Sequence, residues 1–192
     1  MAPVGVGGSL PRPPPVPRMG ERMFDTCVLG VDPGVARLGL AVVGREGRKA
    51  ALVWADTIRT PSNQDESARL LHLVGAMRVA IAQHEPTCVA IERVAFSRNR
   101  SSALTVARVT GAVMVVAAEA GLPVAEYSPT QVKSAVTGIG NADKDQVRTA
   151  LIRVHAMREV PDQPDAADAI AVALTHLTGE RLRTAARAGA SR

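Results

Sequence analysis

Two carboxylates stand in apolar surroundings where a charged side chain needs a particular reason. Asp32 ends the apolar run CVLGVD, and the Pro33-Gly34 turn that follows leaves its carboxylate at the edge of a sheet. Glu92 interrupts a second apolar run, CVAIERV, where glutamate is rare and no helix cap is needed. Because an unpaired buried charge is costly, Asp32 is either a turn-capping residue or a ligand. Glu92 is either one partner of a buried ion pair or a ligand.

Two more carboxylates, Asp165 and Asp168, open the last apolar segment, DAADAIAVALTHL. Their spacing of three residues places them on one face of a helix, about one turn apart. Asp165 alone could be a helix-terminal residue favoured by the helix dipole. Asp168 shares a stripe with Val172, so packing of that stripe on a sheet would carry Asp168 inward.

The four acids together predict a site for phosphoryl transfer. Carboxylate oxygens, without Cys or His at zinc-ligand spacing, favour Mg²⁺ or Mn²⁺ over zinc. Several carboxylates gathered in one place would raise one another's pKa unless divalent cations neutralised them. We therefore expect the acids of two strand ends and one helix start to share metal ions.

The elements that must position these acids follow from periodicity and turn signals. We expect three strands of an antiparallel meander, then a helix, a buried strand, a second helix, a short strand and two closing helices. A capping box from Asp143 to Gln146 opens the first of these closing helices, and Pro164 precedes the other. This order predicts an α/β fold with one five-stranded mixed sheet and helices on both faces. The expected elements cover residues 27–34, 38–44, 51–60, 67–84, 88–96, 101–121, 122–129, 146–157 and 165–177.

Length and composition are those of a single globular domain. The chain has 192 residues, and six of its thirteen prolines lie in residues 1–22, which we expect to be a disordered Pro/Gly-rich extension. Met19 and Met23 lie just before the first strand, so an over-called start codon is an alternative explanation of this segment. The domain should cover residues 23–179, followed by a basic flexible tail over residues 180–192.

Charge, apolar runs and cysteine usage narrow the class of protein. The net charge of +5 comes from arginines in residues 1–22 and 180–192, and the domain between them is neutral overall, so bulk charge says little about nucleic acid. No uncharged apolar run approaches the roughly 18 residues of a membrane span. Cys27 and Cys88 lie in apolar segments, which indicates buried, reduced thiols and a cytoplasmic protein.

Five segments in one order resemble RuvC-type crossover junction endodeoxyribonucleases, the Holliday junction resolvases. Together they span about residues 26–178, and the acids fall in all four places that the family pattern expects. The segments are GVDPGVARLGLAVV, AIERVAFSRN, SALTVARVTGAV, QVKSAVTGIGNADKDQV and DAADAIAVALTH.

The resemblance implies a ribonuclease H-like fold and a homodimer that nicks two strands of a four-way DNA junction symmetrically during recombination and repair. It implies 5′-phosphate and 3′-hydroxyl ends, and branch-migration partners of the RuvA and RuvB families. The family's catalytic and metal-binding tetrad falls on Asp32, Glu92, Asp165 and Asp168. We expect two Mg²⁺ ions per site, with Mn²⁺ as a substitute.

The resemblance also points to residues for DNA binding. Lys133 and Lys144 match lysines that lie near DNA phosphates, and Lys49 is the only other lysine, against twenty arginines. The alternative is that both lysines belong to a solvated loop or helix end. Arg98 and Arg100 belong to a run of arginines with no acid between Glu92 and Glu119, which is either a DNA-binding strip or a solvated face.

One position departs from the family pattern. Members commonly carry an aromatic residue three positions after the strand glutamate, but this chain has Ala95 there and Phe96 one residue later. A one-residue shift along a strand reverses the face of the side chain. Phe96 could therefore stack on a DNA base only if the chain bulges or leaves the strand, and otherwise it is a core residue.

Three other functions fit parts of the sequence. The segment VDPGVARLGLAVV also resembles the phosphate-binding hairpin of actin-like and sugar kinases, but such kinases need two domains of this kind. A DNA-binding subunit without catalysis would not need all four acids, and cleavage of RNA·DNA hybrids is a rival within the same fold.

The helix over residues 101–120 is apolar almost all round, which predicts that a second copy covers its outer face in a twofold dimer.

Overall fold

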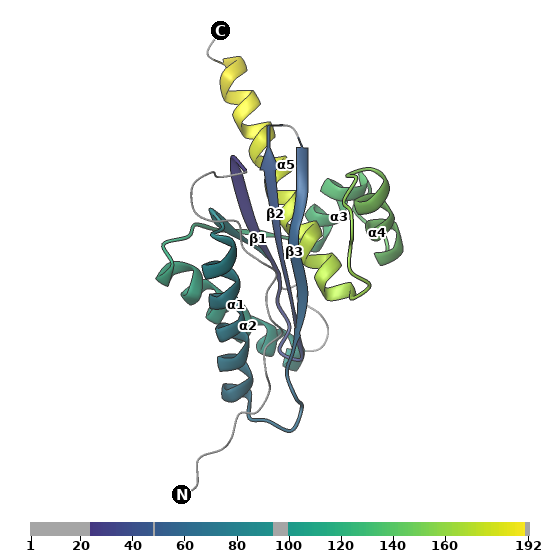
Figure 1. The fold of residues 1–192 in the computed structure, drawn as a ribbon. Helices are drawn as coiled ribbons and strands as arrows, with labels where there is room; N and C mark the ends of the chain where they lie inside the picture. The colour runs from purple at the N-terminus through teal and green to yellow at the C-terminus, as the bar shows by residue number, and fades with distance from the viewer. Residues whose placement is uncertain (1–23, 48, 94–99, 191–192) are drawn as a thin grey trace, which may run out of the picture.

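A five-stranded mixed sheet forms the centre of the computed structural model, which describes residues 24–47, 49–93 and 100–190. The strands are β1 (Thr26–Asp32), β2 (Arg37–Glu46), β3 (Lys49–Arg59), β4 (Cys88–Glu92) and β5 (Val124–Tyr127). They are arranged in the order β3-β2-β1-β4-β5 (Figure 1). The first three strands are antiparallel, whereas β4 runs parallel to both β1 and β5. The predicted antiparallel meander and five-stranded mixed sheet are confirmed.

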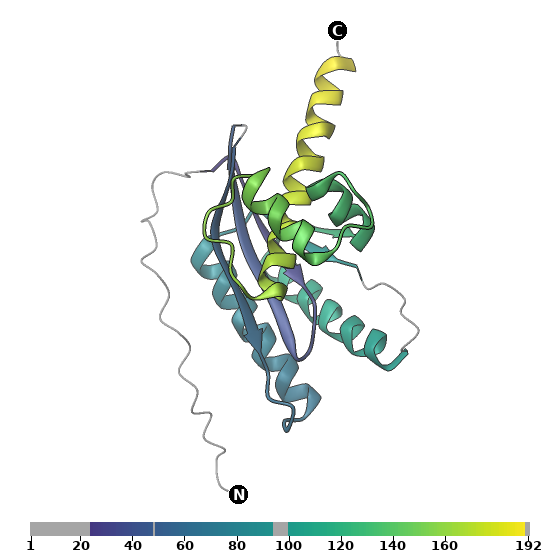
Figure 2. The ribbon, with the colours of Figure 1, turned by 90° about the vertical axis from the view of Figure 1, so that its right-hand side faces the viewer.

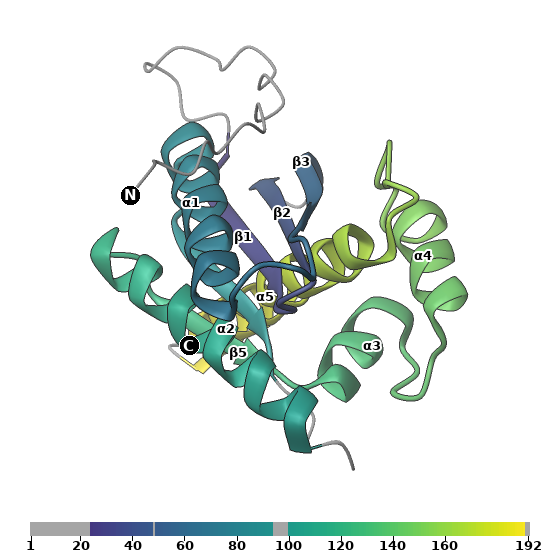
Figure 3. The ribbon, with the colours of Figure 1, turned by 90° about the horizontal axis from the view of Figure 1, so that it is seen from below.

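Helices cover both faces of the sheet, as predicted. They are α1 (Glu66–His84), α2 (Arg100–Glu119), α3 (Pro129–Thr137), α4 (Lys144–Arg153) and α5 (Pro164–Ala190). Figures 1 and 3 show α1 and α2 together on one face and α5 across the other, with α3 and α4 beside α5. In the side view, α5 continues past the end of the sheet (Figure 2).

The two faces bury different side chains, because alternate residues of each strand point to opposite sides. On the side of α1 and α2 the core holds large aliphatic residues such as Leu29, Leu40 and Ile91. On the side of α5 the strands contribute Val28, Ala41 and Ala90, which pack with the alanine-rich run of the helix. The α5 side therefore brings helix and strands unusually close together.

Two glycines allow this close approach. A Cβ atom on Gly30 of β1 would lie 2.1 Å from the carbonyl oxygen of Ala169, and one on Gly39 of β2 would lie 2.0 Å from that of Asp165. Real Cβ atoms do not approach backbone oxygens so closely, so any larger residue would push α5 away from the sheet. The glycines thus fix the distance between the start of α5 and the ends of the strands.

Several boundaries differ from the predicted ones. Helix α3 was not predicted, although Ser128 and Gln131 form a capping box at its start and Pro129 is its first residue. The predicted box of Asp143 and Gln146 is confirmed at the start of α4. Strand β4 ends at Glu92 and not at residue 96, and β5 is shorter than predicted. Residues 1–22 lie outside the described part of the chain.

The last two helices also differ from expectation. Helix α4 ends at Arg153, before a loop in which Ala156 and Glu159 have positive φ angles. Helix α5 continues beyond residue 177 to Ala190, because the alanines and arginines that follow Gly179 are good helix formers. Within the described residues, no helix is long and apolar enough to cross a membrane.

Candidate active site

The two strand acids end neighbouring parallel strands and point to the same face. In the β1–β4 pair Val31 lies beside Ile91, so Asp32 and Glu92 follow at the same level of the sheet. Alternation places Asp32 on the side of Val28 and Gly30, and Glu92 on the side of Ala90, which is the side of α5. The strands therefore direct both carboxylates toward the start of that helix.

The two helix acids meet them there. Asp165 and Asp168 lie in the first turns of α5, and the contact at Gly39 holds the backbone of Asp165 directly against the strands. Burial, followed by the nearby carboxylates of Glu92, Asp168 and Asp165, raises the pKa of Asp32 to about 7. Burial and Asp168 also raise the pKa of Glu92. The four predicted acids are thus close enough to repel one another.

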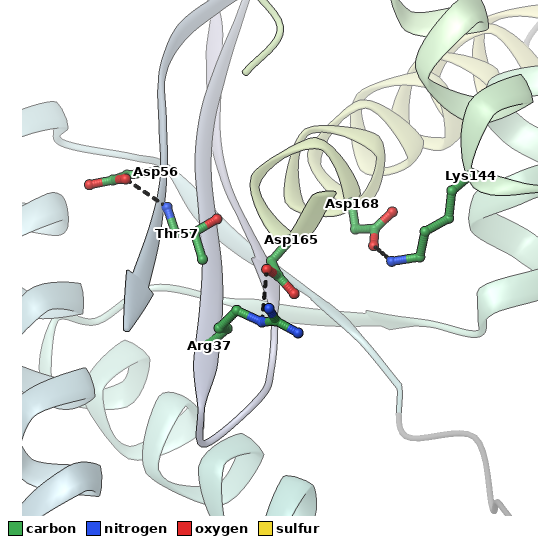
Figure 4. Close-up of polar contacts among 6 residues, drawn as sticks. All are labelled: Arg37, Asp56, Thr57, Lys144, Asp165 and Asp168. Carbon is green, nitrogen blue, oxygen red and sulfur yellow. Dashed lines mark hydrogen bonds and ion pairs between the residues drawn. The ribbon is translucent and has the colours of Figure 1, made fainter. Parts of the chain in front are cut away.

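Basic side chains hold both helix acids (Figure 4). The Nζ atom of Lys144 donates to Oδ2 of Asp168 at 2.7 Å, and Nε of Arg37 lies 3.4 Å from Oδ2 of Asp165. The hydrogen bond to Asp168 raises the pKa of Lys144. The charge of Lys133 on α3 partly opposes the rise in the pKa of Glu92, so the second predicted lysine also lies near the acids.

Both basic partners remain largely in solvent. The side chain of Lys144 is 70% exposed and that of Arg37 is 56% exposed, whereas Asp168 and Asp165 are 23% and 18% exposed. Ion pairs with such exposed partners contribute little stability. Lys144 and Arg37 can therefore leave the acids at low cost when another cation or a phosphate competes for them.

The donor set suits a divalent metal ion, although the acids are not already arranged around one. Among the described residues, no three acidic, histidine or cysteine side chains form a ready metal-binding group, and Asp165 and Asp168 point to their basic partners. The four carboxylates nevertheless supply only hard oxygen donors, which Mg²⁺ and Mn²⁺ prefer. Burial, followed by neighbouring carboxylates, raises the pKa values of Asp32 and Glu92, and a divalent ion bound among the acids would favour their charged forms.

The structure describes the other predicted DNA-binding residues only in part. Phe96 and Arg98 lie outside the described residues, as does Ala95. Arg100 is the first residue of α2, with a side chain that the structure does not describe. Arg108, from the same arginine run, forms an exposed ion pair with Glu66 on α1.

Arg37 was not among the predicted site residues. An exposed arginine at the start of a strand has no local feature that separates it from other surface arginines. Its signal was positional, because Arg37 precedes Gly39 by two residues and so points to the same face, toward α5.

Comparison with known proteins decides the family. The model of the family described as crossover junction endodeoxyribonuclease RuvC matches residues 28–176. The chain belongs to the RuvC family. One curated RuvC, from Saccharopolyspora erythraea, is 45% identical over 151 residues, which cover 78% of this chain and 76% of that protein.

Solved structures agree with this family and fold. The structure of T. thermophilus RuvC in complex with a Holliday junction substrate matches with a TM-score of 0.77 and 36% identity, over 83% of this chain and 97% of that one. The yeast mitochondrial Holliday junction resolvase Ydc2 has a TM-score of 0.60 at 13% identity, over 81% of this chain and 80% of its own, and shows the fold alone. The predicted ribonuclease H-like fold is confirmed. As a RuvC family member the chain is an endodeoxyribonuclease, so the kinase interpretation is wrong.

Proposed function

We propose that this RuvC family member resolves four-way DNA junctions by paired symmetric nicks that leave 5′-phosphate and 3′-hydroxyl ends. The convergence of Asp32, Glu92, Asp165 and Asp168 at one end of the sheet supports the proposal most directly. Acids from two strands and one helix meet there in an open site, beside basic side chains that can bind phosphate. A DNA strand can reach this end of the sheet because the site lies at the surface.

The four carboxylates would hold two divalent ions, Mg²⁺ or Mn²⁺. When bound, such ions lower the pKa of an attacking water and offset the negative charge that develops on the scissile phosphate. The sheet fixes Asp32 and Glu92, whereas Asp165 and Asp168 pair with Arg37 and Lys144 and would have to leave these partners to hold the ions. The close contact at Gly39 keeps the two pairs of acids at a constant separation.

Lys133 and Lys144 would bind the phosphates of the cleaved strand. Both come from the α3–α4 side of the site, and Lys144 would be free to bind a phosphate if Asp168 held a metal ion in its place. Contacts to phosphates position the strand without reading its sequence. The two lysines would therefore align the scissile phosphate, and they leave sequence preference to other residues.

A second copy of the chain would supply the second cut. The outward face of α2 carries two large exposed apolar residues, Leu104 at 55% and Val115 at 57% exposure, and Ala107, Arg108 and Gly111 lie between them. A twofold dimer through α2 would place two active sites on a nearly twofold junction. Sedimentation at micromolar concentration should show a dimer, and Val115→Asp should produce a monomer. A monomeric unaltered protein would contradict this assembly.

The family resemblance also implies where the protein acts and with which partners. We propose that the protein acts in the cytoplasm with the branch-migration proteins RuvA and RuvB. A junction bound to purified RuvA and RuvB should recruit this protein more tightly than the bare junction does, and equal affinity would count against the partnership.

Cleavage of matched substrates tests the central activity. A synthetic mobile four-way junction, the corresponding linear duplex and an RNA·DNA hybrid are incubated with and without Mg²⁺ and resolved on a denaturing gel. Symmetric nicks confined to the junction and dependent on Mg²⁺ are expected. Preferential cleavage of the hybrid would instead identify a ribonuclease H activity, and binding without cleavage would identify a catalytically silent junction binder.

A further inference from the structure

An open pocket lies next to Asp165, one of the four acids, and Lys144 is not part of its lining. Its volume is about 450 Å³, and its walls come from the β1–β2 turn, the first half of α2 and Asp165 at the start of α5. Val35 and Val106 give it an apolar lining, and Thr105 and Arg37 add polar side chains. Figure 4 shows Arg37 and Lys144 on opposite sides of the first turn of α5.

The pocket wall is preformed. Thr60, which is buried, donates from its backbone N–H to the carbonyl of Ala36 at 3.1 Å and from its hydroxyl to the carbonyl of Val35. Arg69 of α1 in turn donates from Nε to the Thr60 hydroxyl at 2.8 Å. These bonds fix the β1–β2 turn, so binding in the pocket would cost little ordering of the protein.

Two arginines lie opposite each other on neighbouring strands at this end of the sheet, a position where two like charges repel. Arg37 of β2 lies directly opposite Arg59 of β3, and both side chains point to the α5 side. Like charges in such a pair destabilise a sheet, and the exposed ion pair of Arg37 with Asp165 offsets little of that repulsion. A phosphate between or beside the two guanidinium groups would relieve it.

We propose that this pocket binds one nucleotide of the cleaved strand next to the scissile phosphate, with its base against Val35 and Val106 and its phosphate on Arg37. This inference rests on the proposed junction cleavage. A strand that crosses the acids must leave the site on both sides, and the lysines hold only one of them. The pocket volume lies within the roughly 300–1,000 Å³ of small-molecule sites, and a base at a branch point leaves its stack more easily than one in continuous duplex.

Three variants separate the parts of the proposal. Arg37→Ala removes the phosphate contact, and Val106→Phe fills the pocket without changing charge. Lys49→Ala, at the far end of β3 from Arg59, is the control for loss of one positive charge. Junction affinity is measured by fluorescence anisotropy in Ca²⁺ at several salt concentrations, and single-turnover cleavage is measured in Mg²⁺. Thermal melting confirms that each variant is folded.

Modified substrates distinguish binding of a base in the pocket from a general structural effect of a substitution. Single abasic residues replace, one at a time, the three nucleotides on either side of the scissile phosphate. The unaltered protein should lose about threefold to tenfold in cleavage rate at one of these positions, because the abasic residue removes the base that packs on the apolar side chains of the pocket. Val106→Phe should cleave the intact junction about tenfold more slowly, with no further loss at that same position.

Arg37→Ala should keep the sensitivity to the abasic position, weaken junction binding about tenfold and lower the salt-dependence slope by about one. Arg37→Lys should recover most of the binding, and Lys49→Ala should stay within about twofold of the unaltered protein. The proposal is overturned if the unaltered protein cleaves every abasic junction as fast as the intact one, or if Val106→Phe retains the abasic effect. Failure of the unaltered protein to cut any four-way junction would instead overturn the proposed function itself.

Discussion

The two faces of the central sheet are packed in different ways, and the difference separates function from stability. Against α1 and α2 the strands bury large side chains, such as Leu40 and Ile91, of which each contributes about 1.5–3 kcal/mol by leaving water. Against α5 they present Gly30 and Gly39, where one additional carbon atom would collide with the helix backbone. The first face supplies much of the hydrophobic stabilisation, and the second sets the separation of the four acids.

The largest effect should come from removing a charge on the α5 side. Asp32→Asn preserves the shape of the side chain but removes a ligand for the metal ions. We expect single-turnover cleavage of a four-way junction to fall by about 10³-fold or more, with junction affinity within a few-fold of the unaltered value. Cleavage at an unaltered rate would remove Asp32 from the mechanism.

A backbone displacement on the same face should have the next largest effect. Gly39→Ala would place a Cβ atom 2.0 Å from the carbonyl oxygen of Asp165, so the start of α5 must move. Because a misplacement of about 1 Å can cost about 10²-fold in rate, we expect a loss of that size in single-turnover cleavage. Gly75→Ala on α1 is the control, since that position is open and alanine favours the helix. Equal rates for the two variants would show that the close contact does not position the acids.

A substitution on the α1 and α2 side of the sheet should lower stability and leave cleavage nearly unchanged. Met77→Ala removes a fully buried side chain of α1 from the core of large residues. We expect unfolding in urea to show a loss of about 2–5 kcal/mol, while cleavage at about 20 °C stays within about threefold. If Met77→Ala slowed cleavage as much as Gly39→Ala does, the division between the two faces would be wrong.

The smallest predicted effect is a pH dependence of stability. Folding raises the pKa of Asp32 from 3.8 to about 7, so in that window the native state binds more protons than the unfolded chain. Stability from this group therefore falls as the pH rises from about 4 to about 7. In EDTA at about pH 8, Asp32→Asn should melt about 3 °C or more above the unaltered protein, and the gap should close toward about pH 4. Glu126→Gln on exposed β5 should follow the unaltered protein, and a gap independent of pH would contradict the assignment.

The four acids could be predicted from the sequence because charged residues are rare in apolar segments. Charged residues beside apolar runs are costly, so the positions of Asp32, Glu92 and Asp168 in the sequence already set them apart. The order of strands and helices was predictable for a similar reason, since their periodicities differ. The mixed sheet and the helices on both of its faces then followed from the fold class, whereas the order of the strands was not predicted.

Features that depend on contacts between distant segments could not be predicted in this way. Arg37 becomes part of the site only because α5 crosses the end of β2, and nothing near Arg37 in the sequence indicates that crossing. Gly39 has the sequence context of an ordinary strand glycine, and only the contact with Asp165 gives it a role. Helix α3 is a different case, because Ser128, Pro129 and Gln131 form a recognisable start signal, but its nine residues are too few for a clear periodicity.

The position of bound metal tests the central claim most directly. Crystals soaked in Mn²⁺ and measured by anomalous diffraction would locate the ions without assumption. We predict manganese at Asp32 and Glu92, with Asp168 and Asp165 turned toward the ions and separated from Lys144 and Arg37. Manganese bound elsewhere, with both ion pairs intact, would contradict the claim that the four carboxylates form one metal-dependent nuclease site.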